Sequence, residues 1–195
     1  MIEWLSGFWF RRNGWTIRGE FPYHIPKMVL AAGPHTSAWD FILGLAIKHE
    51  LKIKDGHYLG KKELFDGPFG WFFRKMGGIP VDRSSSAGMV QQVVQEMARH
   101  DHFILAMSPE GTRKRVNKLK TGFYHIAKEA NIPILPVGFD FLKKEVVIGQ
   151  PMYPSNEEAD LKQIISFLGA CQGKYPEKGV QHLHLNTSKN SKVKT

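Results

Sequence analysis

The sequence is poor in cysteine, because Cys171 is the only one among its 195 residues. A single cysteine excludes an intramolecular disulfide and a zinc site built from several cysteines, and it is typical of a reducing compartment. Long apolar runs are also lacking, since no segment approaches the ~18–20 uninterrupted apolar residues of a membrane-spanning helix. Glu3 comes early and no basic stretch precedes it, which disfavours a secretory signal. We therefore expect a cytoplasmic protein.

Acidic residues are few as well, with 18 Asp and Glu against 27 Lys and Arg, for a formal net charge of +9. Such an excess of positive charge indicates an anionic partner, which could be a nucleic acid, a phospholipid surface or a phosphorylated ligand. Charge alone does not choose among them. Hydrophobic residues make up 42% of the chain, which excludes disorder for most of it. The length suits one domain.

Short apolar runs alternate along the chain with apolar residues at helical spacing. The runs predict strands at residues 28–32, 57–60, 79–81, 103–107, 132–139 and 145–148, and the helical spacing predicts helices at residues 37–50, 68–76, 89–100, 121–130 and 156–168. This alternation predicts a single α/β domain with a mixed, mostly parallel sheet flanked by helices. Pro133 and Pro136 predict that the strand containing them lies at an edge or ends there.

The two ends of the chain differ from the domain, which we expect to span residues 21–180. Residues 1–20 form an aromatic, amphipathic segment in which Leu5 and Phe8 recur at helical spacing. This segment could lie in a membrane interface or pack back onto the domain. Residues 181–195 are polar, and we expect them to be a disordered tail.

The loop after the first predicted strand contains His35 and Asp40. Ligands of α/β sheets usually bind at the carboxyl ends of strands, so this loop is a candidate site. The two side chains can meet if His35 precedes the helix and Asp40 lies in its first turn. A carboxylate bonded to one imidazole nitrogen would leave the other nitrogen as a base. Alternatively, Ser37 and Asp40 form a capping box with a purely structural role.

Two further loops follow predicted strands and carry cations. Arg83 follows a short apolar strand, where its guanidinium could bind an anion or simply face solvent. In the later loop, Gly111 permits a tight turn and Arg113 begins a compact cationic group that would suit a phosphate. Glu110 could orient an arginine there or accept a hydrogen bond from a ligand hydroxyl. A solvated basic turn is the alternative for this loop.

Taken together, these loops resemble the HxxxxD type of glycerolipid acyltransferase, whose best-known members are the 1-acylglycerol-3-phosphate acyltransferases. Four motifs carry the resemblance, in order and with family-like spacing, namely His35-Thr-Ser-Ala-Trp-Asp40, Gly77-Gly-Ile-Pro-Val-Asp-Arg83, Pro109-Glu-Gly-Thr-Arg113 and Ile134-Leu-Pro-Val137. The match covers roughly residues 28–140. Ser108 and Lys114 depart from the family's usual residues, which leaves the acceptor lipid open.

The resemblance implies a glycerol-3-phosphate acyltransferase-like fold and the transfer of a fatty acyl group to a lysophospholipid hydroxyl, most simply that of 1-acylglycerol-3-phosphate. The donor would be the thioester of acyl-CoA or acyl carrier protein, with no other cofactor, no metal and no acyl-enzyme. His35 would be the general base and Asp40 its orienting carboxylate. The implied phosphate-binding residues are Arg83, Glu110, Gly111, Thr112 and Arg113, and Lys61 is a possible electrostatic support.

The same resemblance implies a peripheral protein on an anionic membrane surface, with no nucleic acid as partner. The main alternative is a basic lipid- or nucleic-acid-binding module without catalytic activity. A serine hydrolase is disfavoured because no Gly-x-Ser-x-Gly occurs. A metal site is disfavoured because the closely spaced His182 and His184 lie in the expected tail. Cys171 has no neighbours in sequence that favour a nucleophile.

Overall fold

A seven-stranded sheet organises the chain in the computed structural model, which describes residues 2–82 and 86–183. Its strands are β1 (Thr16–Arg18), β2 (Lys27–Gly33), β3 (Gly56–Lys61), β4 (Gly78–Val81), β5 (Phe103–Met107), β6 (Ile134–Asp140) and β7 (Glu145–Ile148). They lie in the order β1-β7-β6-β2-β5-β3-β4. Within the described residues, neighbouring strands pair in parallel apart from β6 and β7, which are antiparallel. The mixed, mostly parallel sheet expected from the sequence is confirmed.

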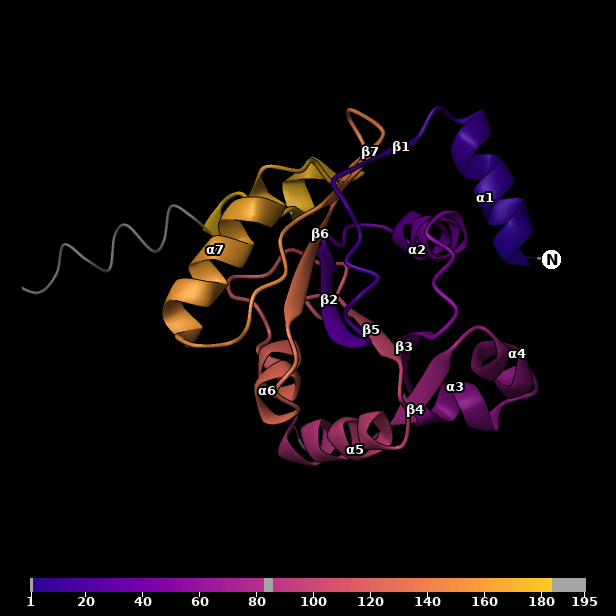
Figure 1. Ribbon diagram of the computed structural model, residues 1–195. Coiled ribbons are helices and arrows are strands. Elements are labelled where there is room, and N and C mark those ends of the chain that lie inside the picture. The colour runs from indigo at the N-terminus through magenta and orange to yellow at the C-terminus, as the bar shows by residue number, and fades with distance from the viewer. Residues whose placement is uncertain (1, 83–85, 184–195) are drawn as a thin grey trace, which may run out of the picture.

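Helices cover both faces of this sheet. They are α1 (Ile2–Arg12), α2 (Trp39–Glu50), α3 (Lys62–Asp66), α4 (Gly70–Lys75), α5 (Ser86–Ala98), α6 (Gly122–Glu129) and α7 (Glu157–Gly169), followed by the short 3₁₀ helix η1 (Pro176–Lys178). Figure 1 shows α1 and α2 on one side of the sheet, and α6 and α7 on the other. Because both faces are covered, the central strands are almost continuously apolar rather than alternating.

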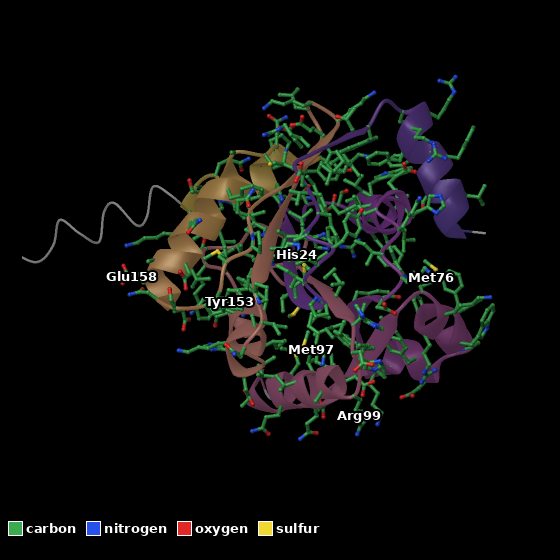
Figure 2. All side chains as sticks on the ribbon, viewed as in Figure 1. His24, Met76, Met97, Arg99, Tyr153 and Glu158 are labelled. Carbon is green, nitrogen blue, oxygen red and sulfur yellow. The ribbon has the colours of Figure 1, made fainter. Side chains whose placement is uncertain are left out.

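The core accordingly divides into two clusters, one for each face of the sheet. Phe123, Ile164 and Leu168 lie in the cluster beneath α5, α6 and α7, whereas Leu43 and Ile47 lie in the cluster beneath α1 and α2. In Figure 2, Met97 points from α5 toward the sheet, whereas Arg99, just after the end of that helix, points away from the sheet. This division is what the helical spacing of apolar residues predicts.

Of the two expectations for the prolines, the edge position of β6 is wrong, because β6 lies between β7 and β2, whereas Pro133 does mark a strand end, directly before Ile134. A proline has no backbone N–H to donate to a neighbouring strand, so inside a sheet it lies where no carbonyl oxygen of that strand is opposite its nitrogen. The carbonyl of Pro136 points past the end of β7, where it accepts a hydrogen bond from the Gly149 N–H at 2.9 Å. The nitrogen of Pro136 faces the same side, so its missing N–H falls beyond the β7 pairing, which begins at Val137.

The N-terminal segment packs against the domain and also keeps an apolar face exposed. Phe10 and Trp15 are buried, and the ring of Trp9 stacks on that of Trp39 at 5.7 Å between centroids. Leu5 and Phe8, in contrast, expose 50% and 55% of their surface. In the part of the chain that the structure describes, no helix is both long and apolar enough to cross a bilayer.

Residues 181–183, which we expected to belong to the tail, pack against the domain. Leu183 is buried, Gln181 donates a side-chain hydrogen bond to the carbonyl of Cys171 at 3.0 Å, and His182 lies 2.7 Å from the carbonyl of Val116. Burial of Val180 and Leu183 therefore extends the domain through residue 183. Residues 184–195 lie outside the described residues.

Candidate active site

The register of the sheet brings the candidate loops together. Ala31 of β2 pairs with Met107 of β5, so the loop with His35 and the loop with Arg113 leave the sheet side by side. A cleft of about 1510 Å³ runs over these strand ends. The predicted site residues that line it are His35, Asp40, Lys61, Gly111, Thr112 and Arg113. Arg83 lies outside the described residues.

The side chains of His35 and Asp40 are in contact, with 3.0 Å between Nδ1 and Oδ2. His35 lies in the loop after β2, and Asp40 is the second residue of α2, the arrangement that allows two residues five apart to meet. The Asp40 side chain is 1% exposed and that of His35 is 28% exposed, so the pair opens to the cleft on the imidazole side. Asp40 at Nδ1 fixes the tautomer that leaves Nε2 for proton transfer.

The carboxylate of Asp40 is held by its own loop. Oδ2 accepts hydrogen bonds from the backbone N–H groups of Thr36 and Ser37, both at 2.8 Å, and Oδ1 accepts one from the Ser37 hydroxyl at 3.2 Å. The Ser37 oxygen in turn accepts from the N–H of Trp39 at 3.1 Å. The contact with His35 and the Ser37–Asp40 bonds, which the sequence posed as alternatives, are therefore both present, although α2 itself has Ala38 at its N-cap with no side-chain cap. A carboxylate with several donors is fixed in direction.

Glu110 supports this loop from beneath, with 1% of its surface exposed. Its Oε1 accepts a hydrogen bond from the backbone N–H of His35 at 2.7 Å, and its Oε2 accepts one from the Ser108 hydroxyl at 2.8 Å. Gly33 makes room for it, because a Cβ there would lie 3.2 Å from Oε2. Burial raises the pKa of Glu110, and the hydrogen bonds from His35 and Ser108 oppose that rise.

The position of Glu110 differs from the expectation that it would orient an arginine or meet a ligand hydroxyl. Its carboxylate is directed to the backbone of His35 instead. Glu110 thus contributes to the site by shaping the loop that holds the imidazole.

The opposite wall of the cleft is cationic. Gly111 turns with a φ of +65°, a conformation that glycine adopts without a steric cost, and Thr112 and Arg113 follow it at the surface. Lys118 and Lys120, which were not among the predicted site residues, also line the cleft. Their place between the basic loop and α6 was the feature of the sequence that could have indicated them.

The remaining walls are mainly apolar. Leu30, Phe41, Leu45, Leu64 and Phe73 line the cleft, from β2 and helices α2 to α4. A surface of this kind favours a hydrocarbon chain, because burying apolar area is worth roughly 25 cal/mol per Å². The cleft therefore combines a base, cations and a long apolar wall.

Two other chemistries find little support among the described residues. Cys171 is buried, and burial together with the nearby Asp140 charge raises the pKa of its thiol to about 11. A thiol in that state is a poor nucleophile at neutral pH. Residues 2–82 and 86–183 contain no group of three or more His, Cys, Asp and Glu side chains placed to hold a metal ion.

Comparisons with known proteins place the chain among acyltransferases. The family model described as Acyltransferase matches residues 17–140, more than half of the chain. The 1-acyl-sn-glycerol-3-phosphate acyltransferase of Streptococcus pneumoniae (strain ATCC BAA-255 / R6) is 32% identical over 134 residues, which cover 64% of this chain and 49% of that protein. The protein of the same name from Limnanthes douglasii is 30% identical over 145 residues, covering 70% of this chain and 47% of the relative.

The chain thus spans about half the length of these curated relatives. Among solved structures, the 1-acyl-sn-glycerophosphate (LPA) acyltransferase PlsC from Thermotoga maritima superposes with a TM-score of 0.58 at 21% sequence identity. That similarity covers 87% of this chain and 76% of the other, and it shows a shared fold.

Proposed function

The chain belongs to the acyltransferase family, and we propose that it transfers a fatty acyl group from a thioester donor to the hydroxyl of a lysophospholipid. The observation that carries this proposal is the contact between His35 and Asp40 at a cleft that also contains Arg113. We further propose 1-acylglycerol-3-phosphate as the acceptor, because the relatives from S. pneumoniae and L. douglasii carry that activity in their names. Acyl-CoA or acyl carrier protein would supply the thioester.

In the proposed reaction, His35 acts as the general base. Its Nε2 takes the proton of the acceptor hydroxyl while the hydroxyl oxygen attacks the thioester carbonyl carbon. The tetrahedral intermediate then expels the thiolate, which takes that proton back from His35, so the products are an ester and a free thiol. No acyl-enzyme forms. Asp40 stabilises the transient imidazolium, and a positioned base of this kind typically contributes about 10²–10⁴-fold.

The cationic wall would bind the acceptor phosphate. Arg113 offers a fork of donors that can bind two phosphate oxygens at once. Gly111 and Thr112 would bring the backbone close to the same phosphate, and Lys61 at the end of β3 would add positive charge. Arg83 is proposed as a second phosphate ligand on its sequence motif alone.

The size of the cleft supports a site for two substrates. Its volume of about 1510 Å³ exceeds the roughly 300–1,000 Å³ of ordinary small-molecule sites. Holding an alcohol and a thioester in line can contribute up to ~7–11 kcal/mol of the barrier. The apolar wall gives the fatty acyl chain a place next to the base.

We also propose that the protein works at an anionic membrane surface, where its lipid substrate resides. Phe69 and Trp71 on and beside α4 expose 68% and 65% of their surface, next to the exposed Arg74 and Lys75. Exposed aromatic rings beside basic residues are typical of proteins that lie in a membrane interface. Each nearby Lys or Arg contributes about 1 kcal/mol to binding an anionic leaflet.

An acceptor and donor panel tests the proposal. Purified protein is given acyl-CoA or acyl carrier protein thioester, with lysophosphatidate or lysophosphatidylcholine as acceptor. We expect transfer to lysophosphatidate, and we expect Arg113→Ala to raise the KM for lysophosphatidate about 10–100-fold, the value of one lost charge-assisted contact. Lipid binding without transfer from either donor would favour the non-catalytic binding module instead.

A further inference from the structure

The segment between α7 and η1 lies directly against the loop that carries His35. The N–H of Tyr175 donates a hydrogen bond to Oγ1 of Thr36 at 3.2 Å. Gly173 is so close that a Cβ there would lie 2.6 Å from Cγ2 and 2.8 Å from Oγ1 of Thr36. The carbonyl of Gln172 accepts a hydrogen bond from the N–H of Phe141 at 2.8 Å, which anchors the segment to the end of β6.

Thr36 connects this segment to the carboxylate of the dyad. Its side chain meets Gly173 and Tyr175, while its backbone N–H donates to Oδ2 of Asp40 at 2.8 Å. That same oxygen lies 3.0 Å from Nδ1 of His35. Thr36 is 1% exposed and is not among the described residues that line the cleft. The Thr36 side chain therefore acts on the reaction indirectly, through Asp40 and the backbone that it shares with His35.

The next residue along the segment contacts the start of α2. Nζ of Lys174 lies 4.5 Å above the ring of Trp39, a cation–π contact, and Trp39 precedes Asp40 directly. Trp39 also stacks on Trp9 of α1. The segment thus contacts the Asp40 turn at two places, one polar and one aromatic.

We propose that Gly173 and Thr36 are positioning residues, which hold Asp40 in line with His35 through the backbone of the 34–40 loop. This inference rests on the proposed function, and it adds Gly173, which lies beyond the 17–140 region matched by the family model. The physical reason for glycine at 173 is the lack of space above Thr36. A side chain at position 173 would displace Thr36. The backbone N–H that Thr36 donates to Asp40 would move with it, and the alignment of Asp40 with His35 would change.

Kinetics of paired variants test this role. We expect Gly173→Ala and Thr36→Val each to lower kcat about 10²-fold, the cost of misplacing a catalytic group by about 1 Å. The KM for lysophosphatidate should change less than about twofold, because neither side chain touches the cleft. Thr36→Ser keeps the hydroxyl that Tyr175 needs, so we expect it to retain activity within a few-fold of the wild type.

A matched control separates positioning from general damage. Gly67→Ala adds the same methyl group where the nearest atom, the carbonyl oxygen of Glu63, would lie 3.7 Å away, an ordinary contact. It should leave kcat, KM and the melting temperature near wild-type values. The positioning role would be overturned if both Gly173→Ala and Thr36→Val keep the wild-type kcat, or if they change only by a raised KM.

A second measurement does not depend on turnover. Nδ1 of His35 lies 3.0 Å from Oδ2 of Asp40, and we expect a proton on Nδ1 to give a low-field resonance that disappears in His35→Ala. We expect this resonance to shift or broaden in Gly173→Ala and to stay unchanged in Gly67→Ala. If the resonance is unchanged in Gly173→Ala, the positioning role is contradicted, whether or not the wild type transfers acyl groups. If the resonance changes but the wild type transfers no acyl group, only the proposed function is contradicted.

Discussion

The carboxylate of Asp40 serves His35 and the first turn of α2 at the same time. Its Oδ2 accepts from two backbone N–H groups and lies against the imidazole Nδ1. An exposed carboxylate could rotate and lose its direction toward His35. At 1% side-chain exposure and with these donors, Asp40 has one orientation, so the hydrogen bonds that order the 36–40 loop also direct the carboxylate to His35.

Glu110 is the residue whose ionisation should be visible in stability. Burial raises its pKa, so the folded chain holds this proton more tightly than the unfolded chain, whose pKa is near 4.5. The resulting stabilisation is present below that value and is lost as the pH rises through the raised pKa. We predict that Glu110→Gln, which cannot ionise, gains stability relative to the wild type as the pH rises from about 4.5.

Urea denaturation of both proteins at several pH values measures this difference. Glu96→Gln is a suitable control, because Glu96 is partly exposed on α5 and bonds to exposed side chains. If the free energies of unfolding of Glu110→Gln and the wild type differ by the same amount at every pH, the raised pKa of Glu110 is contradicted.

At the scale of elements, a buried hydrogen bond ties α6 to the start of α7. The hydroxyl of Tyr124 donates to Oδ2 of Asp160 at 2.9 Å, and the same oxygen accepts from the N–H groups of Ser155 and Asn156. Burial and the Asp160 contact raise the pKa of Tyr124 to about 12. The phenol therefore stays protonated and donating at physiological pH. The contact joins α6, the helix after the cationic loop, to α7, the helix that precedes the segment in contact with Thr36.

We predict that Tyr124→Phe lowers the free energy of unfolding by about 1.5–3 kcal/mol, the usual contribution of a hydrogen bond to a charged group. Tyr153→Phe is the matched control, since Tyr153 is 61% exposed and should shift stability by no more than about 0.5 kcal/mol. Denaturant unfolding monitored by circular dichroism measures both. Equal losses in the two variants would show that the Tyr124 contact contributes nothing.

The elements that the sequence predicted are those with strong apolar patterns. The strands at 103–107 and 28–32 and the helix at 156–168 agree with β5, β2 and α7 within a few residues, because each buries a continuous run or stripe. The three-residue β1 and the five-residue α3 were missed, since such short elements carry no period. The edge position of β6 was wrong because strand order depends on contacts far apart in sequence.

The candidate site was predictable to a similar degree. His35, Asp40, Gly111, Thr112 and Arg113 meet at one cleft, as their loops predicted. What the sequence could not indicate was which way each side chain faces. Glu110 points to the backbone of His35, and the 171–175 segment reaches Thr36 from 139 residues further along the chain.

For the whole molecule, the net charge of +9 and the exposed apolar side chains support the proposed binding to an anionic membrane surface. We predict that Phe69→Ala combined with Trp71→Ala weakens binding to vesicles containing phosphatidylglycerol by about tenfold or more, since each ring loses apolar contact. Leu142→Ala removes an equally exposed apolar residue, 70% exposed in the turn after β6, and should not change binding. Vesicle co-sedimentation at low and high salt measures the effect, and equal weakening by both changes would contradict it.

We propose that one imidazole, aligned by one carboxylate, removes the proton from an acyl acceptor bound beside cationic side chains. The most direct test is the rate of acyl transfer to lysophosphatidate by the wild type, by His35→Ala and by His102→Ala, which removes an exposed imidazole outside the cleft. We predict that His35→Ala loses at least about 10²-fold in kcat while keeping its fold, and that His102→Ala matches the wild type. A folded His35→Ala protein that transfers acyl groups at the wild-type rate would contradict the account.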